Sequence, residues 1–379
     1  MRIAILTPHL GNPWANTGDG FIALGIARLL GGHELVWLPL HRAPTPAERD
    51  LLRTCDRVVV GGSNLVGSQG TVRMAYGVRE LATLGVPVVP MAVGAQARLG
   101  GVPRVDREGR RMLDLWADSG PMSVRDELTR DFLAGLFGRD RVLLTGCSAL
   151  WLEAPRTAPA PGGDVLCVGP LFPSGGPVDT LRFWDLMRLC LRRSEGAPPP
   201  DVVGQQAESS HYERVLGRPV ICFGTDYERA LRTFASARTL VTARIHPAVV
   251  AAGHGVPTVL LAVDERCRSL AALSGIPVLA WDRLVSAEDW SARIDAALAA
   301  YDPSVVDSAM ARQRSAMSSF LAATGLAAPE AEPRLPREPD PQGRPGWLTS
   351  YAVALSKAAP RLSASLLHAA RVLTRPRTN

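Results

Sequence analysis

Residues 239–263 read Thr239-Leu-Val-Thr-Ala-Arg-Ile-His-Pro-Ala-Val-Val-Ala-Ala-Gly-His-Gly-Val-Pro-Thr-Val-Leu-Leu-Ala-Val263. This stretch predicts a short strand, a charged turn, a helix of small apolar residues, a glycine stop and a second strand. Arg244 and His246 would therefore lie at the carboxyl end of a strand and beside a helix N-terminus, where open α/β sheets bind anionic ligands. An arginine next to a titratable imidazole suits an anionic substrate that needs proton transfer. The same pair also fits a surface arginine beside a histidine that caps a helix.

The composition is that of an ordinary globular protein with enough apolar residues for a core. The chain has 379 residues, 46% hydrophobic and 21% charged, and this length favours two domains. The apolar run at the N-terminus is too short for a signal peptide and predicts a first strand, and no run approaches the roughly 20 residues that span a bilayer. The six cysteines lie far apart, mostly among apolar or small residues, which favours buried thiols over disulfides or zinc. We therefore expect a cytoplasmic protein.

The C-terminal tail carries much of the net charge of +6. From Arg344 onward there are six Lys or Arg residues and no carboxylate, so the rest of the chain is close to neutral. A near-neutral body argues against nucleic acid as a partner.

Two segments of different composition follow the predicted globular part. Residues 326–346 are rich in proline and charge, which predicts an extended linker. Residues 347–379 regain apolar side chains at helical spacing and form a basic amphipathic tail. Such a tail, through residues 347–375, can contact an anionic membrane surface, although a helix packed on the protein or a disordered end fits the same pattern.

Strands alternate with helices over residues 1–155, which is typical of a mostly parallel, doubly wound sheet. Strands are expected at 2–7, 34–40, 57–64, 87–93, 122–126 and 141–145, and helices at 21–30, 47–55, 72–84, 107–118 and 127–136. Asn16 or Asp19 can cap the first helix, whose free N–H groups can meet a phosphate. The double glycine Gly61-Gly62 would let a ligand approach the backbone closely, although strand-to-helix turns also use glycine for geometry.

A second alternating set follows the Pro- and Gly-rich segment 154–163, which is the expected interdomain linker. Here strands are expected at 165–168, 201–203, 220–223, 240–241 and 256–263, and helices at 181–191, 211–216, 227–237, 248–252 and 287–320. We therefore predict an α/β protein with two doubly wound domains, 1–155 and 163–325, facing each other across a cleft. The facing loops would bring together Asn16, Asp19, Arg125, Arg244 and His246.

Several short motifs, in this order, resemble those of the polysaccharide pyruvyl transferase family. They are Asn16-Thr-Gly-Asp19, Gly61-Gly-Ser-Asn64, Val93-Gly-Ala-Gln96, Ser123-Val-Arg-Asp-Glu127, Gly146-Cys-Ser-Ala-Leu150, Ala243-Arg-Ile-His246 and Gly255-Val-Pro257. The resemblance covers about residues 1–280 and excludes the tail. It implies a GT-B-like pair of Rossmann-type domains, with the acceptor on the N-terminal side and the donor on the C-terminal side. It also implies transfer of the pyruvyl group of phosphoenolpyruvate to hydroxyls of a glycan or glycolipid-type acceptor of the bacterial cell envelope, usually as a cyclic ketal.

The resemblance also implies roles for individual residues. His246 would be the acid/base catalyst, and Arg244 and Arg125 would bind the anionic groups of the donor. The other substrate-binding candidates are Asn16, Asp19, Gly61, Gly62, Gln96 and His9. No metal and no cofactor beyond the co-substrate phosphoenolpyruvate is expected, because the Asp and His residues show no metal-ligand spacing. A lipid-linked acceptor would suit a protein at the inner face of the membrane.

One position departs from the family, and two other functions stay open. Cys147 stands where members often carry Asp, so any role of that carboxylate is lost here or passes to Ser148. We expect Cys147 itself to be a small buried thiol rather than a nucleophile. A GT-B glycosyltransferase with a nucleotide-sugar donor would place a carboxylate, Asp264 or Glu265, on the donor's ribose. A non-catalytic member would act through its basic tail.

Overall fold

The structure of the chain, a computed structural model, leaves several segments undescribed. It describes residues 1–10, 16–67, 71–97, 99–152, 163–168, 177–192, 200–204, 212–213, 216–224, 226–282 and 284–329. These residues belong to one unit, Met1–Pro336. The expected linker at 154–163, except Gly163, lies outside the described residues, as do the chain beyond residue 329 and therefore the basic tail.

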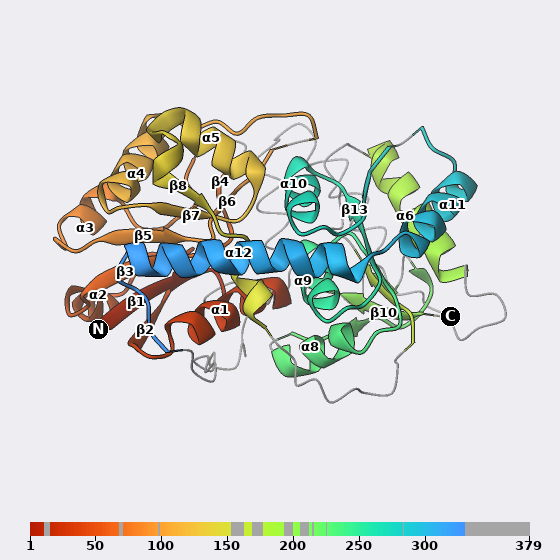
Figure 1. Ribbon diagram of the computed structural model, residues 1–379, viewed down its shortest axis with the longest axis horizontal. Helices are drawn as coiled ribbons and strands as arrows, with labels where there is room; N and C mark the ends of the chain where they lie inside the picture. The colour runs from red at the N-terminus through yellow and green to blue at the C-terminus, as the bar shows by residue number, and fades with distance from the viewer. Residues whose placement is uncertain are drawn as a thin grey trace, which may run out of the picture. The chain divides into compact units, whose positions relative to one another are not determined.

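A four-stranded parallel sheet of order β2-β1-β3-β5 forms the N-terminal half (Figure 1). Its strands are β1 (Arg2–Thr7), β2 (Glu34–Pro39), β3 (Arg57–Gly61) and β5 (Val88–Met91). Ile3 to Leu6 are fully buried, as expected for an inner strand of a parallel sheet that is covered on both faces. Two short parallel pairs complete this half: β4 (Asn64–Val66) with β6 (Gly94–Ala95), and β7 (Met122–Val124) with β8 (Val142–Leu144).

Capping side chains mark the starts of most helices in this half. The helices are α1 (Thr17–Leu30), α2 (Pro46–Arg53), α3 (Val78–Ala82), α4 (Arg107–Asp118) and α5 (Glu127–Phe137), and a 3-10 turn, η2, covers Ser148–Trp151. Asn16, Thr45, Asp106 and Asp126 each accept a backbone N–H of the helix that follows them. Such caps satisfy donors that a helix end leaves unpaired, so they fix where each helix begins.

A six-stranded parallel sheet of order β11-β10-β9-β12-β13-β14 forms the C-terminal half. Its strands are β9 (Val165–Val168), β10 (Asp201–Gly204), β11 (Ile221–Cys222), β12 (Leu240–Thr242), β13 (Thr258–Ala262) and β14 (Val278–Ala280). Its helices are α6 (Pro177–Arg192), α8 (Tyr227–Ala235), α9 (Ile245–Gly253), α10 (Glu265–Leu273) and α11 (Ala287–Ala299).

Both sheets reverse their strand order at one point. The reversal falls between β1 and β3 in the first sheet and between β9 and β12 in the second. Loops that leave neighbouring strands at such a point diverge to opposite faces and open a crevice at the carboxyl ends of the strands. The loops after β1, β3 and β12 are therefore placed to build a ligand site.

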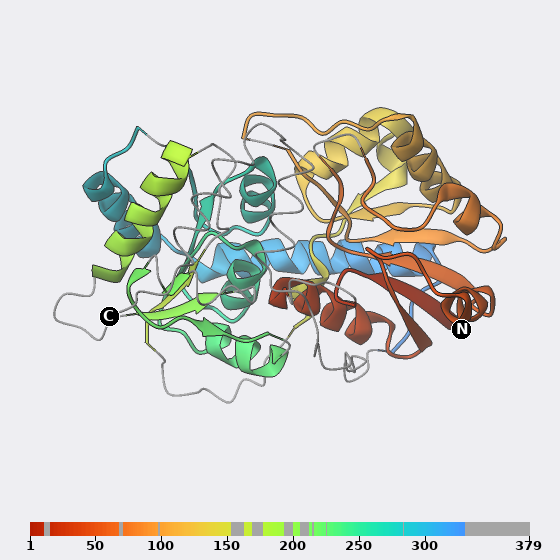
Figure 2. The same cartoon turned by 180° about the vertical axis from the view of Figure 1, so that it is seen from behind.

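The last described helix, α12 (Pro303–Ala323), contacts both halves. It packs on β7 and β8 of the N-terminal half and on α9 of the C-terminal half, and Figures 1 and 2 show it in blue running past both. Met310, Met317 and Phe320 are almost completely buried along its length. Burial of these large side chains stabilises the arrangement of the two halves. None of the described helices is both long enough and apolar enough to cross a membrane.

Most predicted strands and helices are confirmed within a few residues, and three of them, at 2–7, 107–118 and 165–168, have the predicted bounds. The helix predicted at 72–84 is wrong in its first half, because only α3 is helical. Residues 72–75 instead pair with neighbouring segments: Val72 bridges Val66, Arg73 donates its N–H to Leu65, and Ala75 donates to Leu40. These contacts override the local preference for a helix.

Three further differences lie in the C-terminal half. Helix α10 and strand β14 were not predicted, although they continue the alternating pattern. The helix expected at 287–320 is two helices, since Asp302 caps α12 and Pro303 occupies its first turn. Of the helix expected at 211–216, only residues 212, 213 and 216 are described.

Candidate functional site

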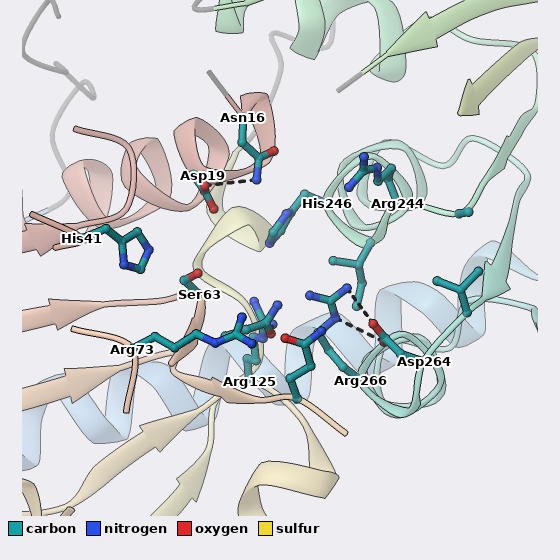
Figure 3. Close-up of a pocket in the computed structure, with 15 residues that line it drawn as sticks. Asn16, Asp19, His41, Ser63, Arg73, Arg125, Arg244, His246, Asp264 and Arg266 are labelled. Carbon is teal, nitrogen blue, oxygen red and sulfur yellow. Dashed lines mark hydrogen bonds and ion pairs between the residues drawn. The ribbon is translucent and has the colours of Figure 1, made fainter. Parts of the chain in front are cut away.

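A pocket of about 300 Å³ lies between loops of the two halves (Figure 3). It is lined by loops that follow strands of both sheets, at the carboxyl ends where the strand orders reverse. The lining residues are Asn16, Asp19, His41, Ser63, Asn64, Arg73, Gln96, Arg125, Ala243, Arg244, Ile245, His246, Val263, Asp264 and Arg266. Six of the nine predicted site residues are among them: His246, Arg244, Arg125, Asn16, Asp19 and Gln96.

His246 occupies the first turn of α9, directly after the loop that leaves β12. The helix packs closely on the sheet through small buried residues such as Ala248 and Ala251, which leaves its N-terminus fixed at the pocket. His246 is only 8% exposed. Its Nε2 is buried and has no hydrogen-bond partner among the described residues. An unsatisfied buried nitrogen is costly in a folded protein, and in a pocket it indicates a ligand partner.

The imidazole of His246 is held in its neutral form. Burial lowers its pKa well below the usual 6.5, and the positive charges of Arg125, Arg266 and Arg244 lower it further. A neutral imidazole can accept a proton. Anions bound between these arginines would offset their charge, so they would raise the pKa of His246 while the ligand is present.

Arg244 is the N-cap residue of α9 and therefore lies where the free N–H groups of the helix face the pocket. Its backbone N–H donates to Thr242 Oγ1 at 2.8 Å, and its Nη2 donates to the hydroxyl of Tyr212 at 3.4 Å. The buried Tyr212 thus holds the guanidinium from the side of the C-terminal sheet. A helix N-terminus and an arginine at one place favour an anion.

Arg125 follows β7 and is 1% exposed, so its position is fixed by burial. Its Nε lies 3.6 Å from Asp126 Oδ2, and its Nη2 donates to Asn64 Oδ1. Burial raises the pKa of Asp126, while the charge of Arg125 opposes that rise. Nη1 of Arg125 is buried without a partner among the described residues. Two orphaned nitrogens, this one and Nε2 of His246, therefore belong to residues of one pocket.

Arg266 was not predicted from the sequence. It lies in the first turn of α10, after β13, and its Nη2 is 2.9 Å from Asp264 Oδ2. Asp264 also accepts the N–H of Cys267 at 2.9 Å and so caps the helix. The signal for this residue was present, because a charged run directly after a strand of a parallel sheet lies at the ligand edge.

Asn16 and Asp19 form the start of α1 at the opposite wall of the pocket. Asn16 Oδ1 accepts the N–H of Gly18 at 3.1 Å, and its Nδ2 donates to Asp19 Oδ2 at 3.1 Å. Asn16 is therefore the cap of the helix, and its side chain holds Asp19 in place. Asp19 is 7% exposed, so a carboxylate faces the cationic cluster from across the pocket.

Three predicted residues do not line the pocket. Gly61 and Gly62 lie against α1 instead: a Cβ on Gly61 would come within 2.8 Å of Ile26, and one on Gly62 would clash with Ile22. The lack of a side chain at these two positions allows helix α1 to pack closely on strand β3, and neither glycine lines this pocket. His9 is buried, and its Nδ1 lies 2.8 Å from the hydroxyl of Tyr227 on α8, so it joins the two halves.

The cysteines are free thiols, as predicted, and all but Cys222 are buried. Cys147 is 1% exposed, and burial raises the pKa of its thiol. Ser148 is fully buried and donates to the carbonyl of Ile22 at 3.1 Å. Neither residue lines the pocket, so neither takes the place of an acceptor-side carboxylate there.

Several lining residues escaped prediction for a common reason. His41, Ser63 and Arg73 lie in loops, and Asn64 begins the short strand β4; the path of all these segments depends on pairing between distant parts of the chain. Ser63 and Asn64 belong to the motif Gly61–Asn64, but the motif alone indicates no role for either residue. No group of three or more His, Cys, Asp or Glu side chains within the described segments is arranged to hold a metal ion.

Solved structures with a similar fold include two described with bound UDP. UDP-GlcNAc 2-epimerase from Methanocaldococcus jannaschii, in complex with UDP-GlcNAc and UDP, is 12% identical over 80% of this chain and 94% of its own, with a TM-score of 0.50. The MnaA–UDP structure from S. aureus is 12% identical over 85% of this chain and 97% of its own, with a TM-score of 0.51. At this identity the likeness shows the fold alone, which is the GT-B fold of two Rossmann-type sheets.

Comparison of the sequence with family models identifies the family as well as the fold. Residues 16–265 match the model of the family described as Polysaccharide pyruvyl transferase. No curated protein matches the sequence significantly. The chain belongs to the polysaccharide pyruvyl transferase family and is a transferase. The matched range begins at Asn16 and ends at Glu265, so it contains every lining residue of the pocket except Arg266.

Proposed function

We propose that this chain transfers the pyruvyl group of phosphoenolpyruvate to hydroxyls of a glycan or glycolipid-type acceptor, with His246 as the acid/base catalyst. One observation carries the proposal: a buried, neutral histidine with an unpartnered Nε2 lies among three arginines in one pocket. Phosphoenolpyruvate carries a phosphate and a carboxylate, which guanidinium groups and helix N-termini bind well. The orphaned Nη1 of Arg125 supports the same assignment.

In ketal formation every proton released by the acceptor is taken up again, and the reaction needs no metal ion. Two sugar oxygens bond to C2 of the donor, C3 gains a proton, and phosphate leaves from C2. Each hydroxyl loses one proton, so one proton goes to C3 and the other leaves with the phosphate. As the hydroxyl oxygen bonds to C2, neutral His246 accepts its proton and delivers a proton to C3 in the same addition.

The arginines have a separate task in this reaction. Positive charge develops at C2 when C3 is protonated, and the donor's own carboxylate stabilises it. Arg125, Arg244 and Arg266 hold the phosphate and stabilise the negative charge that it carries away. Fixed charges in a shielded pocket need no reorganisation during the reaction, which makes them effective.

The alternative of a nucleotide-sugar donor needs a carboxylate that is available to a ribose. Asp264 instead pairs with Arg266, and Glu265 pairs with Arg268 and accepts the N–H of Gly100 at 3.2 Å. Both carboxylates are therefore already engaged, and Glu265 does not line the pocket. These contacts count against that alternative.

Calorimetry distinguishes the two donors. We expect phosphoenolpyruvate to bind the full chain, and UDP- and GDP-sugars to give no signal. Arg244→Ala should weaken binding of phosphoenolpyruvate at least tenfold, because a charge-assisted contact contributes about 1.5–3 kcal/mol. Arg232→Ala is the matched control, since Arg232 is exposed on α8 and outside the pocket.

Two further results complete the test. His246→Asn should retain phosphoenolpyruvate binding while transfer, followed as phosphate release, falls by at least a hundredfold. A clear signal from a nucleotide sugar with none from phosphoenolpyruvate would refute the proposed donor. Near-normal turnover by His246→Asn would remove His246 from the mechanism.

A further inference from the structure

A second cationic group of the pocket, Arg73 with His41, takes no part in the reaction outlined above. His41 follows β2, and Arg73 lies in the extended segment after β4. The N–H of Ala75 donates to the carbonyl of Leu40 at 2.9 Å, which ties the two segments side by side. Both residues line the pocket, where each is partly desolvated and keeps part of its surface exposed to solvent.

The position of Arg73 is defined by its surroundings. Its backbone N–H donates to Leu65 at 2.7 Å, and its side chain crosses Gly67, where a Cβ would lie 3.0 Å from Nε. No carboxylate in the described segments pairs with its guanidinium. Desolvation lowers the pKa of Arg73, and the charge of Arg266 lowers it further. Arg73 is therefore a cation that has no counter-ion among the described residues.

His41 adds a second donor to this group. Burial and then the charge of Arg73 lower its pKa, while a hydrogen bond with the backbone of Arg73 opposes the shift. In Figure 3, His41 and Arg73 lie across the pocket from Arg244, on the loops of the N-terminal half. An anion bound there would meet an arginine and an imidazole at once.

The donor does not account for these two residues. Both anionic groups of phosphoenolpyruvate are attached to C2, so they must lie close to the atom that reacts near His246. The arginines whose charges act on His246 are Arg125, Arg266 and Arg244, and Arg73 is not among them. A ligand that reaches Arg73 must extend beyond the donor, toward the side where the acceptor enters.

We propose that Arg73 and His41 bind an anionic group, a phosphate or a carboxylate, carried by the sugar acceptor beside the hydroxyls that receive the pyruvyl group. This inference rests on the proposed function and narrows its acceptor to a charged sugar. Ser63, which lines the pocket on the same side, offers a hydroxyl to the neutral part of that sugar.

Three sugars test the subsite by calorimetry with the full chain at low ionic strength: glucose, glucose 6-phosphate and glucuronate. At least one charged sugar should bind about tenfold more tightly than glucose, as expected for one charge-assisted contact of about 1.4 kcal/mol. Comparison of the two charged sugars distinguishes a phosphate from a carboxylate. Arg73→Met should abolish the preference, and Arg73→Lys should retain part of it.

Two controls separate this inference from the proposed function. Arg79→Met, which removes an exposed arginine of α3, should leave all affinities unchanged. Arg73→Met should bind phosphoenolpyruvate within about twofold of the unmodified chain, because the donor's anionic groups are assigned to Arg125, Arg244 and Arg266, which this variant keeps. Equal binding of glucose and both charged sugars would overturn the subsite, and so would loss of phosphoenolpyruvate binding in Arg73→Met. Failure of the unmodified chain to bind phosphoenolpyruvate would instead refute the proposed function.

Discussion

His246 combines two properties that rarely occur together, deep burial and three nearby positive charges. Both lower its pKa, so the imidazole stays neutral in the free protein well below pH 6.5. We expect NMR titration of the ring nitrogens to show this neutral form, and we expect the pKa to rise when phosphoenolpyruvate is bound, because the ligand's negative charge offsets that of the arginines.

The same shift makes stability depend on pH. Below pH 6.5 the unfolded chain protonates His246 while the folded chain does not, so the unfolded state binds more protons. Its contribution to stability is therefore complete above pH 6.5 and decreases as the pH falls below that value, by at most about 1.4 kcal/mol per pH unit. His246→Gln should lack this component of the unfolding free energy. An identical pH profile in urea denaturation of both proteins would contradict the assignment.

The turn between β3 and β4 places Ser63, a residue that lines the pocket, in a strained backbone conformation. Ser63 has φ +70°, directly after Gly62 at φ +63°, and its carbonyl accepts the N–H of Gly94 at 2.8 Å. A left-handed conformation costs an ordinary residue about 1–2 kcal/mol, and the larger entropy of unfolded glycine offsets roughly half of the gain from substitution. Ser63→Gly should therefore raise the unfolding free energy by about 0.5–1 kcal/mol.

Ser63→Ala is the matched control for this prediction. Alanine keeps the strained backbone and loses only the hydroxyl, so its stability should stay near that of the unmodified chain. Urea denaturation of the three proteins gives the comparison. A glycine variant that is no more stable than the alanine variant would show that the turn is not strained. Strain of this kind persists at sites where the conformation serves function.

Elements with regular patterns could be predicted from the sequence, and elements set by long-range pairing could not. The helix at 107–118 has a cap and a clear apolar face, and its bounds were predicted correctly. Residues 72–75 were expected to be helical, yet backbone bonds to Leu40 and Leu65 hold them outside a helix, and no local pattern encodes these bonds. Arg73 was therefore missed, because a residue expected in a helix was not considered for the pocket.

The residues of the candidate site divide in the same way, into those that local sequence patterns reveal and those that depend on long-range contacts. Arg244 and His246 could be found because a strand and a helix flank them closely in sequence. Gly61 and Gly62 illustrate the limit of a motif: the glycines allow α1 to pack on β3, and only the positions of Ile22 and Ile26 reveal this. Arg266 needed helix α10, whose start is set by the cap at Asp264 and was not recognised.

At the scale of the molecule, the pocket depends on contacts that hold both halves in one unit. Helix α12 packs on β7 and β8 of the N-terminal half and on α9 of the C-terminal half. The hydroxyl of Thr17 on α1 donates to the carbonyl of Gly224 at 3.2 Å. The hydrogen bond between His9 and Tyr227 adds a second link, which joins the N-terminal half to α8 of the C-terminal half. The cationic residues from the two halves can therefore act on one small ligand.

The distribution of charge gives the last prediction, which concerns the tail. Residues 344–379 carry six Lys or Arg and no carboxylate, whereas the rest of the chain is close to neutral. Each basic residue near an anionic bilayer contributes about 1 kcal/mol, so the full chain should bind vesicles that contain phosphatidylglycerol and not vesicles of phosphatidylcholine alone. A chain that ends at Pro336 keeps the unit Met1–Pro336 intact and should lose this binding. High salt should also weaken the binding of the full chain, because the attraction is electrostatic. Equal sedimentation of both chains with the anionic vesicles would show that the tail is not a membrane anchor, and a lipid-linked acceptor would then have to reach the pocket without help from residues 347–375.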